Sequence, residues 1–113
     1  ALINNSVLGM VRQWQSLFYG KRYSNTTLNP SEGEQIPNFE MLAQAYGMAA
    51  RTVRSIDEVD AAIEWAMSIN DRPVLIDFRV SKDSMVWPMV AAGVSNDEIR
   101  YAKGMAPDWE VED

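Results

Sequence analysis

The sequence predicts an α/β fold, a parallel sheet flanked by helices. Strand-like apolar runs alternate with segments of helical periodicity, in the order strand, helix, loop, helix, strand, helix, strand. Residues 74–80 are rich in β-branched and aromatic side chains and are partly apolar on both faces, as in strands buried inside parallel sheets. Three strands make a thin sheet, so we expect the C-terminal half of a larger, here truncated, α/β domain.

The first predicted elements are the end of a strand, a helix and a loop. Residues 1–3 form a short apolar run that is typical of a buried strand end. Apolar side chains recur at steps of three and four over residues 7–19, which predicts a helix that Gly20 ends. Residues 20–36 are rich in Ser, Asn, Thr, Gly and Pro, so we expect a long, solvated and mobile surface loop.

The middle of the chain predicts a helix, a strand and another helix. Residues 37–47 favour a second helix, and residues 49–54 alternate weakly, which favours a short strand. Ser55 and Glu58 have the spacing of a capping box at the start of a helix that runs to about residue 69. The apolar stripe expected to face the core comprises Ile56, Val59, Ile63 and Met67.

After residue 80 the periodic pattern weakens. Residues 85–90 are apolar but interrupted by a proline, which indicates an extended segment. Ser95 begins a second capping-box pattern, which predicts a short helix that includes Ile99. We therefore divide the chain into an α/β part at residues 1–80 and a C-terminal lid or tail at residues 81–113.

Composition excludes several classes of function. The 113 residues carry a net charge of −6 without a basic cluster, which argues against nucleic-acid and anionic-membrane partners. The absence of cysteine removes disulfides and thiolate metal sites, and the absence of histidine removes the commonest general base. No apolar run approaches the roughly 18 residues of a membrane span. We expect a cytoplasmic protein of one domain or part of one.

Two amides, Asn4 and Asn5, stand between the first strand and the first helix. A polar turn in that position is where an open α/β sheet presents ligand-binding groups. Amide oxygens and turn carbonyls are hard ligands that suit Mg²⁺. The same residues also suit an ordinary turn, because Asn tolerates left-handed backbone and caps helices. The residues alone leave both interpretations open.

Longer strings then point to a family. The most specific are Gly-Met-Val-Arg-Gln-Trp at residues 9–14 and Trp-Pro-Met-Val at residues 87–90. Leu-Ala-Gln-Ala-Tyr-Gly at residues 42–47 and Arg-Pro-Val-Leu-Ile-Asp at residues 72–77 lie between them. With these strings, over nearly its whole length, the chain resembles the acetohydroxyacid synthase (acetolactate synthase) large catalytic subunits. The matching part is the C-terminal part of their thiamine diphosphate-binding domain.

The resemblance implies a thiamine diphosphate-dependent transferase. Members of this family decarboxylate pyruvate and condense it with a second 2-oxo acid, pyruvate or 2-oxobutyrate, in branched-chain amino acid biosynthesis. The implied cofactors are thiamine diphosphate and Mg²⁺, with FAD bound outside this fragment. The implied partners are a second copy of the chain in a homo-oligomer and a regulatory small subunit. The family's catalytic glutamate lies in another domain, so we expect no catalytic residue here and no activity of the fragment alone.

The resemblance also assigns metal-binding residues. Asn5 would give its side-chain oxygen to Mg²⁺, and Val7 would give its backbone carbonyl. The family's other protein ligand is the aspartate of a Gly-Asp-Gly motif that this chain lacks. Asn4 is implied to shape the turn or to touch the diphosphate.

The following residues would approach the cofactor and the substrate. Gly9 would let the backbone come close to either of them, and Met10 completes the implied cofactor-binding set. Met10 and Trp14 lie four residues apart, on one side of the predicted helix, at the implied substrate channel. The resemblance gives Trp14 a preference for 2-oxobutyrate as acceptor and a contact with herbicidal inhibitors.

Two rival interpretations remain open. A sister thiamine enzyme, such as pyruvate oxidase or glyoxylate carboligase, shares the fold and the amide pair. A non-catalytic interaction module would explain the missing acid and base without truncation. A Gly-Asp-Gly motif encoded upstream of Ala1 would separate the second rival from the enzymes.

Overall fold

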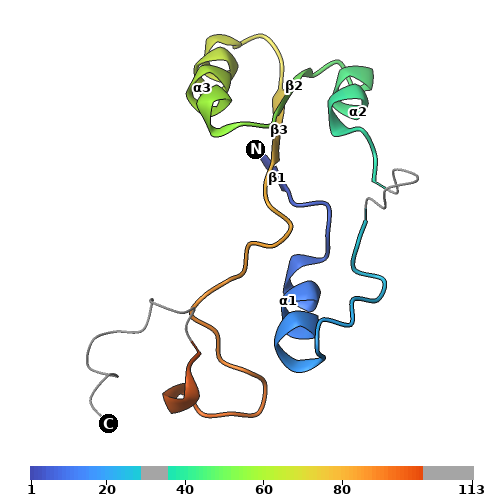
Figure 1. Cartoon of the computed structure of the whole chain (residues 1–113). Coiled ribbons are helices and arrows are strands. Elements are labelled where there is room, and N and C mark those ends of the chain that lie inside the picture. Colours follow the sequence, from blue (N-terminus) through green and yellow to red (C-terminus); the bar gives the residue numbers. More distant parts are fainter. Residues whose placement is uncertain (29–35, 101–113) are drawn as a thin grey trace. The chain divides into compact units, whose positions relative to one another are not determined.

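A computed structural model of the chain describes residues 1–28 and 36–100 (Figure 1). It divides the chain into two compact units, Ala1–Asp83 and a second unit that starts at Ser84. The strands are β1 (Leu2–Asn4), β2 (Ala49–Val53) and β3 (Val74–Arg79). The α-helices are α1 (Gly9–Phe18), α2 (Phe39–Ala45) and α3 (Val59–Ser68), and two 3₁₀ turns are η1 (Ile56–Glu58) and η2 (Asn96–Glu98).

The described strands form one parallel sheet in the order β1-β3-β2. The register places Leu2 opposite Asp77 and Arg51 opposite Ile76, so β3 is hydrogen-bonded on both sides. The prediction of a parallel sheet flanked by helices is confirmed. The central position of β3 explains why residues 74–80 carry apolar side chains on both faces.

The helices α2 and α3 cover opposite faces of this sheet (Figure 1). Successive side chains of a strand point to opposite faces. Arg51 of β2 stacks over the indole of Trp65 on α3, with 4.2 Å between the guanidinium carbon and the ring centre. The next residue, Thr52, donates from Oγ1 to Glu40 Oε2 on α2 over 2.7 Å. The sheet therefore has one α3 face and one α2 face.

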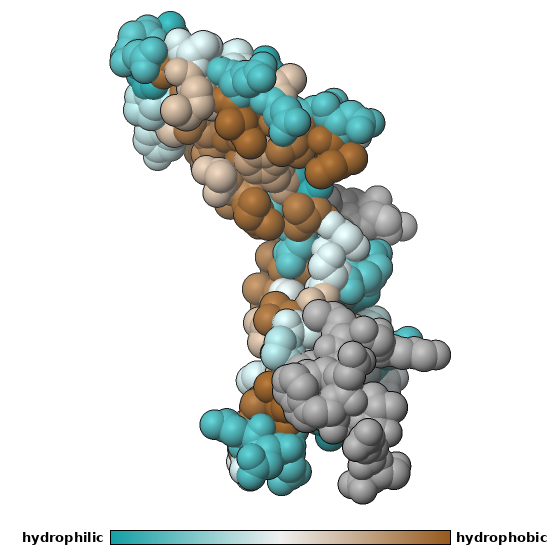
Figure 2. Space-filling view, turned by 90° about the vertical axis from the view of Figure 1, so that its left-hand side faces the viewer, coloured by the Kyte–Doolittle hydropathy of each residue, from teal (hydrophilic) through white to brown (hydrophobic). Residues whose placement is uncertain are grey.

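The hydrophobic core of this unit lies between α3 and the sheet. It consists of buried Val53, Ala62 and Ile76, with Val59, Trp65, Ala66, Val74 and Phe78 packed around them. The predicted core stripe of α3 is therefore wrong except for Val59. Ile56 is 82% exposed and Met67 is 76% exposed. Figure 2 shows hydrophobic residues among the hydrophilic ones on the side of the chain that carries α3.

The physical reason is the small size of two alanines. Ala62 and Ala66 let the α3 backbone approach the sheet closely, and the indole of Trp65 fills the remaining volume. Both stripes obey the helical period and share Val59, so periodicity could not choose between them. Hydrophobicity alone favours the larger apolar side chains as core residues, whereas close packing buries the two alanines.

The capping box at the start of this segment is confirmed. Ser55 Oγ accepts from the Asp57 N–H over 3.3 Å, and Glu58 Oε2 accepts from the N–H groups of Arg54 and Ser55. These two backbone hydrogen bonds lower the pKa of Glu58 below its ordinary value of 4.5. Glu58 therefore stabilises the fold above that value, and its contribution is lost as the pH falls through the folded-state pKa. The box differs from expectation in that it opens a 3₁₀ turn, which α3 then continues.

We expect Ser55→Ala to lower the stability of this unit by about 1 kcal/mol, because one backbone N–H loses its acceptor at the start of η1. Faster amide hydrogen exchange in peptides from η1 and α3 would measure the loss. Ser68→Ala is the matched control, since the Ser68 hydroxyl donates to a carbonyl at the other end of α3 and caps no N–H. Equal effects of the two substitutions would contradict the capping role.

Two other predictions need correction. Residues 20–25 are exposed, as expected of a solvated loop, but Thr26 is only 2% exposed and Thr27 pairs with Val7 in an antiparallel bridge. The loop prediction for residues 29–35 lies outside the described residues. Ser95 caps a short helix as predicted, but this is the 3₁₀ helix η2, which ends before Ile99, where the backbone is already extended.

None of the helices in residues 1–28 and 36–100 has the length and apolar character needed to cross a lipid bilayer.

Candidate functional site

The candidate site begins with two consecutive side-chain turns after β1. Asn4 Oδ1 accepts from the Ser6 N–H over 3.1 Å, and Asn5 Oδ1 accepts from the Val7 N–H over 3.1 Å. Ser6 between them has φ of 59°, in the left-handed region that residues with a Cβ seldom adopt. The turn is therefore a defined structure and not a loose connection.

The Asn5 amide keeps one free acceptor position. An amide oxygen has two lone pairs, and the Val7 N–H uses one of them. The amide nitrogen of the same side chain lies beside Gly9, where an added Cβ would come within 2.8 Å of Asn5 Nδ2. Gly9 therefore makes room for the Asn5 side chain, which gives this glycine a structural role next to the implied cofactor site.

The Val7 carbonyl lies outside the local backbone ladder. Val7 is buried opposite Thr27, and the two hydrogen bonds that flank this pair run from Leu8 N–H to the Thr26 carbonyl and from Leu28 N–H to the Ser6 carbonyl, both over 2.9 Å. Neither bond uses the Val7 carbonyl. The turn thus offers two hard oxygen atoms, Asn5 Oδ1 and Val7 O, two residues apart.

A buried polar cluster supports the turn from the sheet. Asp77 of β3 is 1% exposed, and its Oδ2 accepts from Asn4 Nδ2 over 3.3 Å. Arg79 Nε lies 3.1 Å from the same oxygen, in an ion pair whose N–H does not align as a hydrogen bond. Arg79 Nη1 donates to Ser6 Oγ over 3.3 Å. Among the described residues, Asp77 Oδ1 has no hydrogen-bond partner.

Side-chain hydrogen bonds hold the first residues of the loop against α1. Gln15 Oε1 accepts from Thr26 Oγ1 over 2.9 Å, and Gln15 Nε2 donates to the Ser24 carbonyl over 3.1 Å. Arg12 forms an ion pair of 2.8 Å with Asp83 and stacks over the ring of Tyr23. The Arg12 hydrogen bond lowers the pKa of Asp83 below its ordinary value.

The two residues of the implied substrate channel are partly exposed on α1. Met10 is 46% exposed and Trp14 is 47% exposed. Trp14 lines an open depression of about 530 Å³ with Val11, Gln15, Tyr19, Arg22 and Ser24. Met10 does not line it. The structure therefore places Trp14, but not Met10, at this depression.

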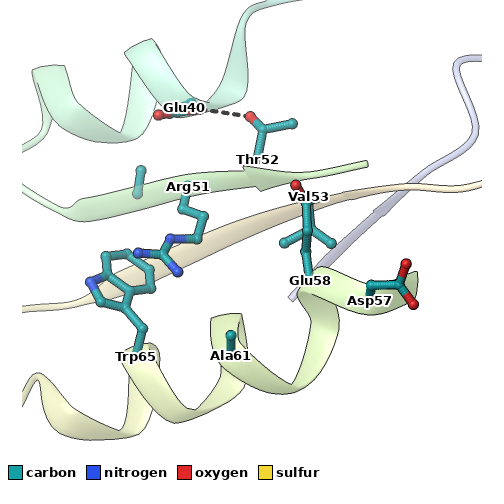
Figure 3. Close-up of a pocket in the computed structure, with 9 residues that line it drawn as sticks. Glu40, Arg51, Thr52, Val53, Asp57, Glu58, Ala61 and Trp65 are labelled. Atoms are coloured by element: carbon teal, nitrogen blue, oxygen red, sulfur yellow. Dashed lines mark hydrogen bonds between the residues drawn. The ribbon is translucent and has the colours of Figure 1, made fainter. Parts of the chain in front are cut away.

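A second cavity of about 530 Å³ was not predicted and lies at the edge of the sheet (Figure 3). Arg51 and Trp65 stack at one side of it, and Asp57 and Glu58 contribute carboxylates from η1 (Figure 3). An arginine within the otherwise uncharged residues 49–53 was the available signal. Neither cavity includes Asn4, Asn5 or Val7 in its lining.

Sequence reasoning also missed Ser6, Asp77 and Arg79 as part of the turn. The available signal was an acid in the centre of the apolar strand Val-Leu-Ile-Asp-Phe-Arg. In residues 1–28 and 36–100, no three carboxylate, imidazole or thiol side chains come together to hold a metal ion.

Comparisons with known proteins give the family. Residues 1–78 match the family model described as "Thiamine pyrophosphate enzyme, C-terminal TPP binding domain". The chain is 54% identical to the acetolactate synthase large subunit of Corynebacterium glutamicum and 57% identical to the acetolactate synthase of Mycobacterium bovis. These matches cover 97% and 95% of the chain, and in each case 17% of the relative.

A more distant relative is also an acetolactate synthase large subunit. The chain is 41% identical to the acetolactate synthase isozyme 2 large subunit of Escherichia coli, over 87% of the chain and 17% of that protein. The chain thus spans about a sixth of the length of the curated relatives it matches. From the family model and the parallel sheet together, the chain belongs to the thiamine pyrophosphate enzymes, as part of their C-terminal cofactor-binding domain.

Proposed function

We propose that the chain is part of an acetolactate synthase large subunit, where it binds the magnesium ion and diphosphate of thiamine diphosphate. The full-length protein would decarboxylate pyruvate and condense it with pyruvate or 2-oxobutyrate. The observation that carries the proposal is the turn after β1, where Asn5 Oδ1 and Val7 O are both available as ligands. The identities of 41% to 57% with acetolactate synthases support the choice within the family.

The residues of the turn fit a magnesium ion. Mg²⁺ prefers oxygen ligands and is commonly held by few protein groups together with substrate phosphates and water. Asn5 and Val7 would supply two of these oxygens, and Gly9 leaves space beside the amide. Remaining ligands would come from the diphosphate and from a carboxylate elsewhere in the full-length protein. Thiamine diphosphate supplies the decarboxylation and acyl-transfer chemistry when it is bound.

The chain's own residues would then shape the metal-binding turn and select the acceptor substrate. Asn4 lies with both ends of its amide engaged inside the protein, which favours its role in shaping the turn over contact with the diphosphate. Trp14 would form an apolar wall of the acceptor channel, which its position at the α1 depression supports. The proposal also includes residues 81–113 as a lid or tail and a cytoplasmic location. In the full-length protein it includes FAD bound elsewhere, a regulatory small subunit and assembly into homo-oligomers.

The test compares the 113-residue chain with the full-length protein that contains it. We expect the full-length protein to form 2-acetolactate from pyruvate with thiamine diphosphate and Mg²⁺, and the isolated chain to form none. The reason is that the turn supplies only part of a metal site and no acid or base for the cofactor ring. Product detection by mass spectrometry measures both. Carboligation by the isolated chain would refute the proposal that other domains complete the site, and an inactive full-length protein would refute the function.

We expect Trp14→Leu to reduce the preference for 2-oxobutyrate over pyruvate as acceptor by about tenfold or more, since one methylene in an apolar pocket is worth roughly 1–3 kcal/mol. The ratio of the two products from mixed acceptors, in the full-length protein, measures the preference. Tyr46→Leu is the control, because this aromatic side chain is exposed just after the end of α2 and lines neither of the two cavities described above. An unchanged ratio in the Trp14 variant would contradict the selector role.

A further inference from the structure

We propose that Asp77 is a positioning residue for the metal-binding turn, and that it acts by orienting the Asn4 amide with the help of Arg79. The inference rests on the proposed function, because it concerns how the turn is held and not which ion the turn binds. It assigns a role to a buried carboxylate of β3 that touches neither cofactor nor substrate.

The register brings the three residues to one face of the sheet. Asn4 lies opposite Arg79, and Asp77 lies two residues before Arg79 on the same strand. Side chains two apart point to the same face, so all three lie on the face opposite the α3 core. A carboxylate that is 1% exposed is unfavourable unless it is paired. Its two partners here, Asn4 and Arg79, are the residues that also contact Ser6.

Asp77 decides which way the Asn4 amide points. An ionised carboxylate only accepts hydrogen bonds, so the NH₂ end of Asn4 faces Asp77 and the oxygen end faces Ser6. The Ser6 N–H and hydroxyl both lie within hydrogen-bond distance of that oxygen. A reversed amide would present NH₂ to the Ser6 N–H, and two donors would face each other. The reversed amide would also turn its oxygen toward the Asp77 carboxylate, so that two acceptors would face each other; Asp77 and the Ser6 N–H thus favour the same orientation.

Arg79 contacts both Asp77 and Ser6. It pairs with Asp77 and donates to Ser6 Oγ, so Ser6 is held by Asn4 from one side and by Arg79 from the other. Ser6 needs this support because its φ of 59° is uncommon for a residue with a Cβ. Asn5 and Val7 are the two neighbours of Ser6 in the chain. The backbone conformation of Ser6 therefore sets the positions of Asn5 Oδ1 and Val7 O.

The test measures metal binding and not turnover. Mn²⁺ is titrated into the full-length protein with saturating thiamine diphosphate, and free Mn²⁺ is followed by electron paramagnetic resonance. We expect Asp77→Asn to raise the Mn²⁺ dissociation constant by about 10- to 100-fold, as is usual when a group that orients a metal ligand is lost. Thermal unfolding of each protein is recorded in parallel, and affinities are measured well below the unfolding midpoint.

Two further variants make the result decisive. Ser6→Gly keeps the left-handed backbone accessible but removes the hydroxyl that links Asn4 and Arg79, and we expect a smaller increase of about 2- to 10-fold. It decides the matter if Asp77→Asn fails to fold. Asp71→Asn is the matched control, because Asp71 also pairs with a neighbouring arginine but is exposed and remote from the turn in sequence.

The outcomes separate the two proposals. Weaker Mn²⁺ binding by Asp77→Asn and Ser6→Gly, with Asp71→Asn unchanged, supports the positioning role. Wild-type affinity in both variants, even with a lowered unfolding temperature, overturns that role and leaves the proposed function intact. Absence of Mn²⁺ binding by the wild-type protein with thiamine diphosphate overturns both.

Discussion

Replacement of Asn5 by alanine in the full-length protein is expected to weaken Mg²⁺-dependent binding of thiamine diphosphate by about 100-fold or more. The loss of a ligand should exceed the roughly 10- to 100-fold effect of losing a group that only orients one. The backbone turn should persist, because Asn4 still accepts from the Ser6 N–H and Thr27 still pairs with Val7. Calorimetric titration of the cofactor, with and without Mg²⁺, measures the effect.

Two further variants are compared with Asn5→Ala, one as a control and one as an intermediate case. Asn38→Ala removes an amide of the same kind, which caps α2 by accepting from the Met41 N–H, and should leave cofactor binding unchanged. Gly9→Ala leaves the Asn5 amide in place but adds a Cβ 2.8 Å from its nitrogen, and should give an intermediate loss. Cofactor affinity that is unchanged in Asn5→Ala, or lowered equally in Asn38→Ala, would contradict the ligand role.

Replacement of Ile76 by alanine is expected to destabilise the α/β unit by about 2–5 kcal/mol, because it opens a cavity in the centre of the core. Ile76 lies on the central strand and packs with Val53 and Ala62 between the sheet and α3. Hydrogen-exchange mass spectrometry of peptides from β3 and α3 measures the change locally, with roughly tenfold faster exchange for each 1.4 kcal/mol.

Ile56→Ala is the matched control for the core substitution. It removes the same side-chain atoms from a residue that is 82% exposed in η1, so we expect little change in exchange. The sequence alone predicts burial of both side chains, because Ile56 belongs to the core stripe expected for the helix after residue 55 and Ile76 to the predicted central strand. A larger effect at Ile56 than at Ile76 would show that the core assignment is wrong.

Much of the fold could be predicted because single elements carry strong local signals. The β-branched strand at residues 74–80, the cap at Ser55 and the glycine that follows α2 each depend on a few neighbouring residues. The face of α3 could not be predicted, because Ala62 and Ala66 are buried by the fit between helix and sheet and not by their own hydrophobicity. The burial of Thr26 could not be predicted for a similar reason, since it depends on contacts with α1 and with the amide turn.

The candidate site could likewise be predicted only in part. Asn5, Val7 and Gly9 could be proposed from the sequence because a short motif carries them, and the structure adds the geometry that makes two oxygens available. Asp77 and Arg79 could not be connected to the turn, because they lie more than 70 residues away in sequence, at separations of 73 between Asn4 and Asp77 and between Ser6 and Arg79. Only the parallel register of β1 and β3 brings them together.

The most direct test is a crystal structure of the full-length protein with thiamine diphosphate and Mn²⁺, with the ion located by anomalous diffraction. We expect the ion within roughly 2.0–2.3 Å of both Asn5 Oδ1 and Val7 O, close to the spacing of oxygen ligands around Mg²⁺. An ion bound elsewhere, with the Asn5 oxygen hydrogen-bonded only to the Val7 N–H, would contradict the metal site.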